Sequence, residues 1–250
     1  GWLYSHNQVE GNFLALGKVD NKVRRSYYTN ISWVRSHPHN NIRVGFGNIV
    51  DSIMVIRKGE PFFQVEHAPL DPTYAANSFG HEDERGNYAL APVTGEKSRL
   101  GHQYEYKGYS PTFGWRYAEE KTRELDEQGL IHFGKNRPYK KIYRSESKGK
   151  PIQNLWDDIS NLTRTERNKR NYPTQKPLKM LERIVRTSCP PGGRVLDPFC
   201  GNGTTAIATF NIGDGRSCDT YDISEPALDI ASLAMKESGV QVARLPELPR

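Results

Sequence analysis

The most informative segment of the sequence is Arg194-Val-Leu-Asp-Pro-Phe-Cys-Gly-Asn-Gly-Thr-Thr205. A Pro-Pro-Gly-Gly turn (190–193) precedes it and predicts a short buried strand that ends at Asp197. The following Gly201-x-Gly203 predicts a tight loop, and Thr204-Thr205 predicts the first turn of a helix. A strand, a glycine loop and a helix in this order present backbone N–H groups and a helix N-terminus to an anionic ligand.

A second predicted strand completes this ligand site. Ser217-Cys-Asp-Thr-Tyr-Asp-Ile223 is strand-like, and it ends in Asp222 about 20 residues beyond the glycine loop, the spacing of the acidic residue in dinucleotide-binding folds. An acidic side chain at that position can accept hydrogen bonds from both hydroxyls of a ribose. The ligand is therefore expected to be a nucleoside that carries an anionic group.

Two nucleoside ligands fit the pattern. Gly201-Asn-Gly-Thr-Thr-Ala206 satisfies the dinucleotide pattern G-x-G-x-x-G/A, which is a weak signal alone and leaves a nicotinamide-dependent oxidoreductase as an alternative. The carboxylate of Asp197, directly before the loop, opposes a pyrophosphate but suits the ammonium group of S-adenosylmethionine. A nucleoside triphosphate site is excluded because no lysine follows the loop.

Three motifs in one order resemble a known family. They are Tyr172-Pro-Thr-Gln-Lys-Pro-Leu178, Val195–Thr205 and Tyr221-Asp-Ile-Ser224. Together they resemble the C-terminal half of the amino-group DNA methyltransferases, in the permuted group whose catalytic motif precedes the cofactor motifs. The resemblance implies an α/β fold with a permuted, Rossmann-like sheet and an inserted, loop-rich target-recognition region. It also implies methyl transfer from S-adenosylmethionine to an exocyclic amino group in DNA, of adenine in preference to cytosine.

The resemblance also assigns roles to residues. Asp197, Phe199 and the glycine loop would hold the methionine side of the cofactor, Asp222 its ribose, and Ile223 would lie beside its adenine. Lys176 would pair with the cofactor carboxylate. The full set of expected cofactor-binding residues is Thr174, Gln175, Lys176, Pro177, Asp197, Phe199, Gly201, Gly203, Thr204, Thr205, Asp222 and Ile223. No metal is expected, because direct methyl transfer needs none.

One segment imitates the catalytic motif of the family. Leu70-Asp-Pro-Thr-Tyr74 is close to Asp-Pro-Pro-Tyr, which must end a central strand so that it can receive a flipped-out base. Asp71 instead follows a polar run that contains proline, and Thr73 stands where the family has proline. We interpret this segment as unrelated to catalysis. The catalytic tetrapeptide is expected upstream of Gly1, in which case the sequence is an N-terminally truncated methyltransferase.

Three regions are expected. Residues 1–61 are assigned to the remainder of the catalytic half, with strands near 1–5, 28–34 and 48–56 and a short helix over 10–20. Residues 62–156 are assigned to target recognition and contain a helix over 118–128. Aromatic and basic residues interleave in His102–Tyr117, where the aromatic rings either stack on bases or form the region's own core.

The third region, 157–250, is assigned to the cofactor-binding half. It contains predicted helices over 178–188 and 225–236. Leu178, Leu181, Ile184 and Val185 share one face of the first helix and are expected in the core. The basic stretch 164–170 is either a solvated linker or a contact to DNA phosphates.

Composition limits the class of protein. A net charge of +6 and an isoelectric point near 9.1 suit a nucleic-acid partner, which the resemblance implies to be double-stranded DNA. Three cysteines without metal spacing favour reduced thiols, and no apolar run is long enough to cross a membrane. We expect a cytoplasmic prokaryotic or phage enzyme of a restriction–modification system, with a second copy or a restriction subunit as candidate partners. The alternative from another class is a catalytically empty DNA-binding subunit.

Overall fold

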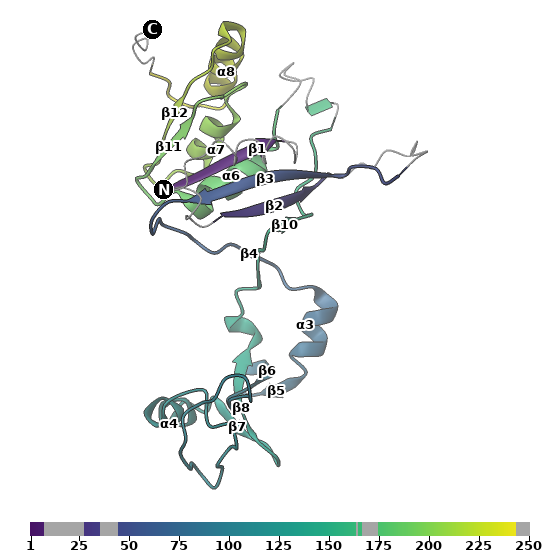
Figure 1. Cartoon of the computed structure of the whole chain (residues 1–250), viewed down its shortest axis with the longest axis vertical. Helices are drawn as coiled ribbons and strands as arrows, with labels where there is room; N and C mark the ends of the chain where they lie inside the picture. Colours follow the sequence, from purple (N-terminus) through teal and green to yellow (C-terminus); the bar gives the residue numbers. More distant parts are fainter. Residues whose placement is uncertain (8–27, 36–44, 164, 167–174, 244–250) are drawn as a thin grey trace. The chain divides into compact units, whose positions relative to one another are not determined.

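The computed structural model describes residues 1–7, 28–35, 45–163, 165–166 and 175–243. These residues divide into two units: the first combines 1–66 with 151–250, and the second is 67–150 (Figure 1). The helix expected over 10–20 lies outside the described residues, as does most of the basic stretch 164–170.

The first unit contains a four-stranded sheet in the order β1-β3-β2-β10. Its strands are β1 (Trp2–Asn7), β2 (Tyr28–Val34), β3 (Val50–Arg57) and β10 (Leu155–Trp156). Strand β3 runs antiparallel to both neighbours, whereas β10 runs parallel to β2. The three N-terminal strands confirm the expected ones. Alternate apolar side chains such as Trp33, Ile53 and Val55 are buried and form the core on this sheet.

Helix α6 (Leu178–Ser188) has the predicted bounds. Met180, Leu181 and Ile184 pack against the four-stranded sheet, which confirms an amphipathic helix with its apolar face in the core. Leu178, at the start of α6, belongs instead to a second core cluster with Cys200 and Ala206. Helix α6 therefore joins the four-stranded sheet to the glycine loop.

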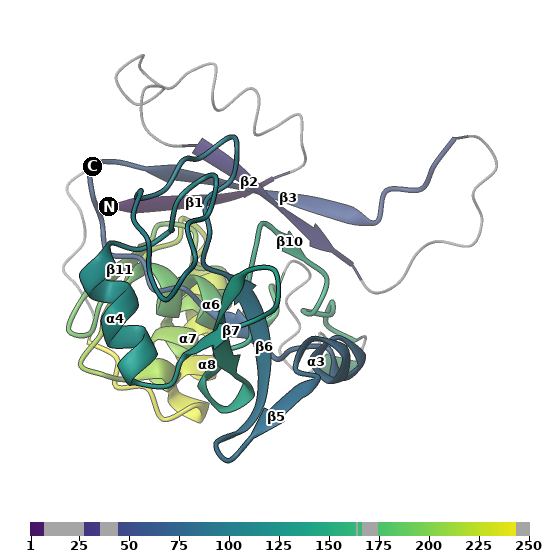
Figure 2. The same ribbon diagram turned by 90° about the horizontal axis from the view of Figure 1, so that it is seen from below.

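Residues 194–220 form a parallel strand–helix–strand unit. Strand β11 (Arg194–Asp197) pairs in parallel with β12 (Ser217–Thr220), and α7 (Thr204–Ile212) connects them. Helix α8 (Glu225–Glu237) follows. Figures 1 and 2 show α7 beside α6, with α8 beyond it. The second predicted strand ends at Thr220, earlier than expected. Two backbone hydrogen bonds nevertheless extend the pairing at Tyr221, to Asp197 O at 2.9 Å and from the N–H of Cys200 at 2.8 Å.

The second unit is built on a four-stranded antiparallel sheet in the order β5-β6-β8-β7. It also contains two helices, and helix α4 confirms the helix expected over 118–128. The short strands β4 and β9 lie where the chain enters and leaves this unit. In chain order the elements are β4 (His67–Ala68), α3 (Pro72–Ser78), β5 (His81–Asp83), β6 (Gly86–Pro92), α4 (Glu119–Glu127), β7 (Ile131–Phe133), β8 (Pro138–Tyr143), the 3₁₀ turn η1 (Arg144–Glu146) and β9 (Lys150–Pro151).

Aromatic residues of 102–117 form the core of the second unit. Trp115 is fully buried, with Tyr104 stacked on it at 5.3 Å between ring centroids and Tyr106 edge-on at 6.2 Å. The hydroxyl groups of the two tyrosines bond Thr122 and Asp126 on α4, at 2.7 Å each. The sequence left two interpretations open, in which these rings either stack on bases or form the core of their own region. The second interpretation is correct for Tyr104, Tyr106 and Trp115.

Candidate nucleoside-binding site

Asp197 closes the glycine loop at the end of β11. Its Oδ2 accepts a hydrogen bond from the Thr205 hydroxyl at 2.5 Å, and its Oδ1 accepts one from the backbone N–H of Phe199 at 3.1 Å. One carboxylate thus ties the strand end both to the loop and to the first turn of α7. The negative charge of Asp197 therefore lies at the loop entrance, as the sequence predicted.

Two glycines shape the loop through backbone conformations that other residues rarely adopt. Gly201 has φ +52° and Gly203 has φ +76°. At Gly203 a Cβ atom would also lie 3.2 Å from the Cβ of Ala231 on α8. Glycine at 203 therefore permits both the left-handed turn before α7 and the close approach of α8.

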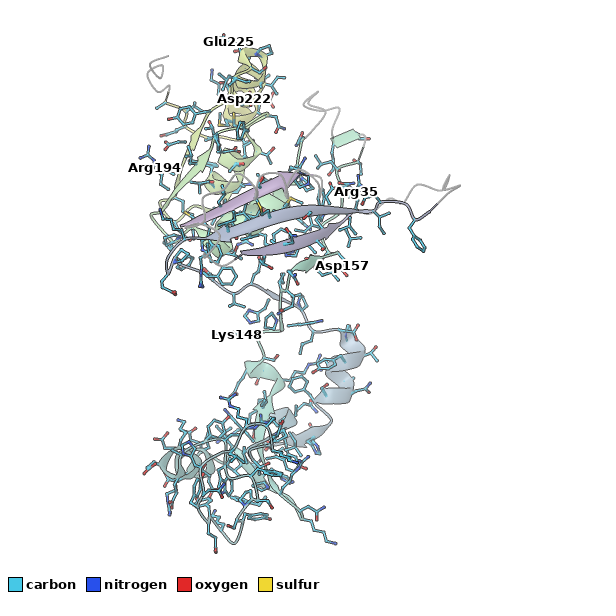
Figure 3. The ribbon with its side chains drawn as sticks, viewed as in Figure 1. Arg35, Lys148, Asp157, Arg194, Asp222 and Glu225 are labelled. Carbon is cyan, nitrogen blue, oxygen red and sulfur yellow. The ribbon has the colours of Figure 1, made fainter. Side chains whose placement is uncertain are left out.

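Asp222 joins the loop to the end of β12. Its Oδ2 accepts a 2.9 Å hydrogen bond from the backbone N–H of Gly201, and its Oδ1 accepts a 3.0 Å bond from the N–H of Ser224. Figure 3 shows Asp222 near the start of α8, close to Glu225. Because β11 and β12 are parallel, their carboxyl ends meet at one edge, where Asp197, the glycine loop and Asp222 come together.

Two apolar side chains beside this edge are open to solvent. Phe199 is 82% exposed and Ile223 is 99% exposed, although both are large and apolar. Exposed apolar groups next to a few fixed polar groups are typical of a site that takes an organic ligand. Both residues belong to the predicted set.

Asn202 was not predicted from the sequence. It is buried between the two glycines, and its Oδ1 accepts a 2.7 Å hydrogen bond from the hydroxyl of Thr204, a predicted residue that is also buried. The Nδ2 group of Asn202 has no hydrogen-bond partner among the described residues. A buried amide that lacks a partner costs free energy, so this donor is a candidate ligand contact. Its only sequence signal is a polar residue between two glycines.

The turn before α6 contributes fewer described residues. Thr174 lies outside the described part of the chain. The carbonyl of Pro177 accepts a 3.1 Å hydrogen bond from the N–H of Met180 and so begins α6. Burial lowers the pKa of Lys176, while the negative charge of Asp51 raises it. Lys176 is thus attracted by the carboxylate of Asp51 near the start of β3. The sequence did not indicate this interaction.

A polar cluster lies beside that lysine, and three of its members, His6, Arg35 and Asp51, were not predicted from the sequence. His6 Nε2 lies 3.3 Å from Asp51 Oδ2, and Arg35 Nε lies 3.5 Å from Asp51 Oδ1. Burial lowers the pKa of His6, and the charge of Lys176 lowers it further. The Oε1 atom of Gln175 is buried and has no hydrogen-bond partner among the described residues. His6, Arg35 and Asp51 lie at or directly beside the ends of β1, β2 and β3, so only the pairing of the strands brings these three together.

The Cys200 thiol in the glycine loop is buried. Burial raises the pKa of Cys200 to about 11, and the charges of Asp197 and Asp222 raise it as well. A thiol with this pKa is almost wholly protonated at neutral pH. Within the described residues, no group of three His, Cys, Asp or Glu side chains is placed to hold a metal ion.

The Asp-Pro-Thr-Tyr segment belongs to the second unit. Asp71 is the N-cap of α3, and its Oδ1 accepts a 2.8 Å hydrogen bond from the N–H of Tyr74. Pro72 occupies the first turn of that helix. The carboxylate therefore caps a helix, and the segment follows only the two-residue strand β4.

The fold and the site define an α/β protein with a glycine loop between two parallel strands and an acidic residue at the carboxyl end of each. A sequence model described as DNA methylase matches residues 3–232, and the chain belongs to that family. No helix in the described part of the chain has the length and apolar character needed to cross a membrane.

Similar proteins include the type II methyltransferase M.EcaI of Enterobacter cloacae, 30% identical over 218 residues that cover 83% of this chain and 47% of the relative. The Mod subunit of the type III restriction-modification enzyme StyLTI of Salmonella typhimurium is 28% identical over 206 residues, with 75% of this chain and 31% of the subunit covered. The chain thus spans less than half the length of either relative. The crystal structure of an M1.HpyAVI–SAM complex is 15% identical, with a TM-score of 0.45 over 94% of this chain and 74% of that one.

Proposed function

We propose that this chain is the cofactor-binding and DNA-recognition part of a DNA methyltransferase that uses S-adenosylmethionine. The acceptor is the exocyclic amino group of adenine, in preference to cytosine, in the double-stranded DNA of a restriction–modification system. The observation that carries the proposal is the joining of Asp222 to the Gly201 N–H, at the carboxyl edge of β11 and β12, in a member of the DNA methylase family.

The residues present suit this cofactor, which supplies the activated methyl group when bound. Each oxygen of the Asp222 carboxylate accepts one backbone hydrogen bond, which leaves acceptor capacity on both for the hydroxyls of a ribose. The exposed side chain of Ile223 would cover the adenine ring. Asp197 would attract the ammonium group of the methionine part, and Lys176 would attract its carboxylate.

A nicotinamide cofactor suits the site less well. A pyrophosphate at the glycine loop would meet the carboxylate of Asp197, whose hydrogen bonds to Thr205 and Phe199 hold it at the loop entrance. Two negative groups in such a position repel each other. A methionine tail with an ammonium group relieves this repulsion.

We propose that the catalytic tetrapeptide lies outside residues 1–250, on a further strand of the first unit. Among the described strands, β11 pairs only with β12, and β1 pairs only with β3. Leu196 on β11 is 63% exposed and Leu3 on β1 is 56% exposed, which is high for apolar residues of a central sheet. A strand parallel to β11 would end at the edge that carries Asp197 and Asp222.

The second unit is the proposed DNA-recognition part. Lys97, Arg99, Lys135 and Arg137 are exposed on it and are suited to contact phosphates. Trp115, Tyr104 and Tyr106 would act indirectly, because they build the core that supports these loops. A restriction subunit, and a second copy of the chain, are proposed partners of the whole protein.

Calorimetric titration of the full-length protein tests the cofactor. We expect S-adenosylhomocysteine to bind and NADH to give no heat of binding. Binding of NADH without binding of S-adenosylhomocysteine would replace the proposal with the oxidoreductase alternative. If neither ligand binds, the result would contradict both the proposed function and the oxidoreductase alternative.

A further inference from the structure

Helix α6 forms hydrogen bonds with both segments that connect the first unit to the second. We call Gln64–Glu66 the exit segment and Pro151–Asp158 the return segment. The backbone N–H of Gln64 donates a 2.8 Å hydrogen bond to the carbonyl of Thr187 on α6. The N–H of Ile152 in turn donates a 2.9 Å bond to the carbonyl of Glu66, so the exit and return segments also contact each other.

A single arginine of α6 holds the side chains of both segments. The Nε of Arg183 donates to Glu66 Oε2 at 2.9 Å. Its Nη1 and Nη2 donate to the two carboxylate oxygens of Asp158 at 2.9 and 2.5 Å. The guanidinium also lies over the ring of Trp156, 5.0 Å from its centroid. Because the side chain of Arg183 is only 10% exposed, water screens these contacts weakly.

These contacts require the shape of a guanidinium as well as its charge. A planar fork can bond both oxygens of one carboxylate, reach a second carboxylate through Nε, and stack on an indole at the same time. A lysine ammonium cannot do all three. Without Arg183, the carboxylates of Glu66 and Asp158 would repel each other, and Arg186 pairs with only the first of them.

We propose that Arg183 is a positioning residue for DNA, because it fixes both attachment points of the second unit on α6. The same helix follows the turn that contains Lys176, so the attachment points and the proposed cofactor site share one rigid element. The inference rests on the proposed function, since it takes the second unit to be the part that binds DNA.

The substitution Arg183→Lys tests this in the full-length protein, because it keeps the charge and removes the fork. We expect the KM for DNA to rise roughly tenfold, equivalent to the loss of one charged hydrogen bond. The affinity for S-adenosylhomocysteine should stay unchanged. Hydrogen exchange should become faster at the N–H groups of Gln64 and Ile152, which hold the exit and return segments in place.

Arg216→Lys is a matched control. The side chain of Arg216 is 2% exposed and bonds Cys189 O at 3.0 Å and Asp214 Oδ2 at 2.9 Å. These hydrogen bonds lie within the first unit and reach neither segment, although Arg216 and Gln64 line one surface cavity. We expect this variant to lose thermal stability while the KM for DNA and the exchange of Ile152 stay at wild-type values.

The inference is wrong if the two variants raise the KM for DNA alike, or if Arg183→Lys changes neither the KM nor the exchange rates. A wild-type protein that does not bind S-adenosylhomocysteine would contradict the proposed function instead. In that case the exchange rates still decide whether Arg183 holds the two segments.

Discussion

The backbone N–H of Gly201 donates a 2.9 Å hydrogen bond to the carboxylate of Asp222, which joins the glycine loop after β11 to the end of β12. The same carboxylate is the proposed ribose ligand. We expect Asp222→Ala to weaken the binding of S-adenosylhomocysteine roughly 10- to 100-fold, as for the loss of charged hydrogen bonds. Titration calorimetry measures this directly.

Asp219→Ala is the control for that substitution. Asp219 lies on β12, three residues before Asp222, and its carboxylate pairs with Arg194 rather than with the glycine loop. Its replacement should leave the affinity for S-adenosylhomocysteine unchanged. Equal losses in the two variants would mean that Asp222 acts only through the stability of β12.

Gly203 is predicted to be sensitive to even a methyl group. A left-handed residue other than glycine costs about 1–2 kcal/mol, and the 3.2 Å contact with Ala231 adds to that cost in Gly203→Ala. Gly239→Ala is the comparison, because Gly239 has a similar φ of +78° but its nearest neighbour, Phe210, would be 3.9 Å away. Thermal unfolding should show the larger loss for Gly203→Ala. A smaller loss than for Gly239→Ala would contradict the close packing of α7 on α8.

The thiols of Cys200 and Cys218 should resist alkylation. Burial raises the pKa of Cys200 to about 11 and that of Cys218 to about 12, so little thiolate exists at pH 8. Mass spectrometry after treatment with iodoacetamide should find both residues unmodified in the native protein and modified in urea. Rapid modification of native Cys200 would show that the glycine loop opens.

The second unit should lose part of its stability in acid through Asp83. The hydrogen bond from Lys141 is the main reason why the pKa of Asp83 falls from 3.8 to about 2. Since the folded state favours the charged form, this stabilisation is complete above pH 3.8 and disappears as the pH falls towards 2. Asp83→Asn should therefore unfold at a lower temperature than wild type at pH 6, and the difference should shrink near pH 2.

Glu82→Gln, at the neighbouring exposed position on β5, is the control for this pH dependence. Its unfolding temperature should match that of the wild type at every pH. A difference between Asp83→Asn and wild type that is independent of pH would show that the ionic contact with Lys141 contributes nothing.

Local signals account for the parts of the fold that the sequence predicted. Helix α6 follows from the spacing of its apolar residues, and the start of α7 follows from Gly201-x-Gly203. Helix α3 was missed because seven residues show little periodicity, although Asp71 before Pro72 is a recognisable N-terminal signal.

The relationships that escaped prediction depend on contacts between distant segments. Asp51 reaches His6 only because β1 pairs with β3, and Arg183 meets Glu66 only because α6 packs beside the exit segment. Charged residues in such places look like ordinary surface residues in the sequence. The candidate residues of the glycine loop could be named from the sequence because one continuous stretch supplies most of them.

The most direct test of the proposed function is to incubate the full-length protein with double-stranded DNA and S-adenosylmethionine labelled in its methyl group. Digestion of the DNA and mass spectrometry of the nucleosides would then identify the product. We predict labelled N6-methyladenine, and its yield should fall in Asp222→Ala. Labelled N4-methylcytosine would support methyl transfer to DNA but would show that the acceptor is cytosine and not adenine. If the protein binds both DNA and S-adenosylmethionine but the DNA contains no labelled nucleoside, the result would contradict the proposed function.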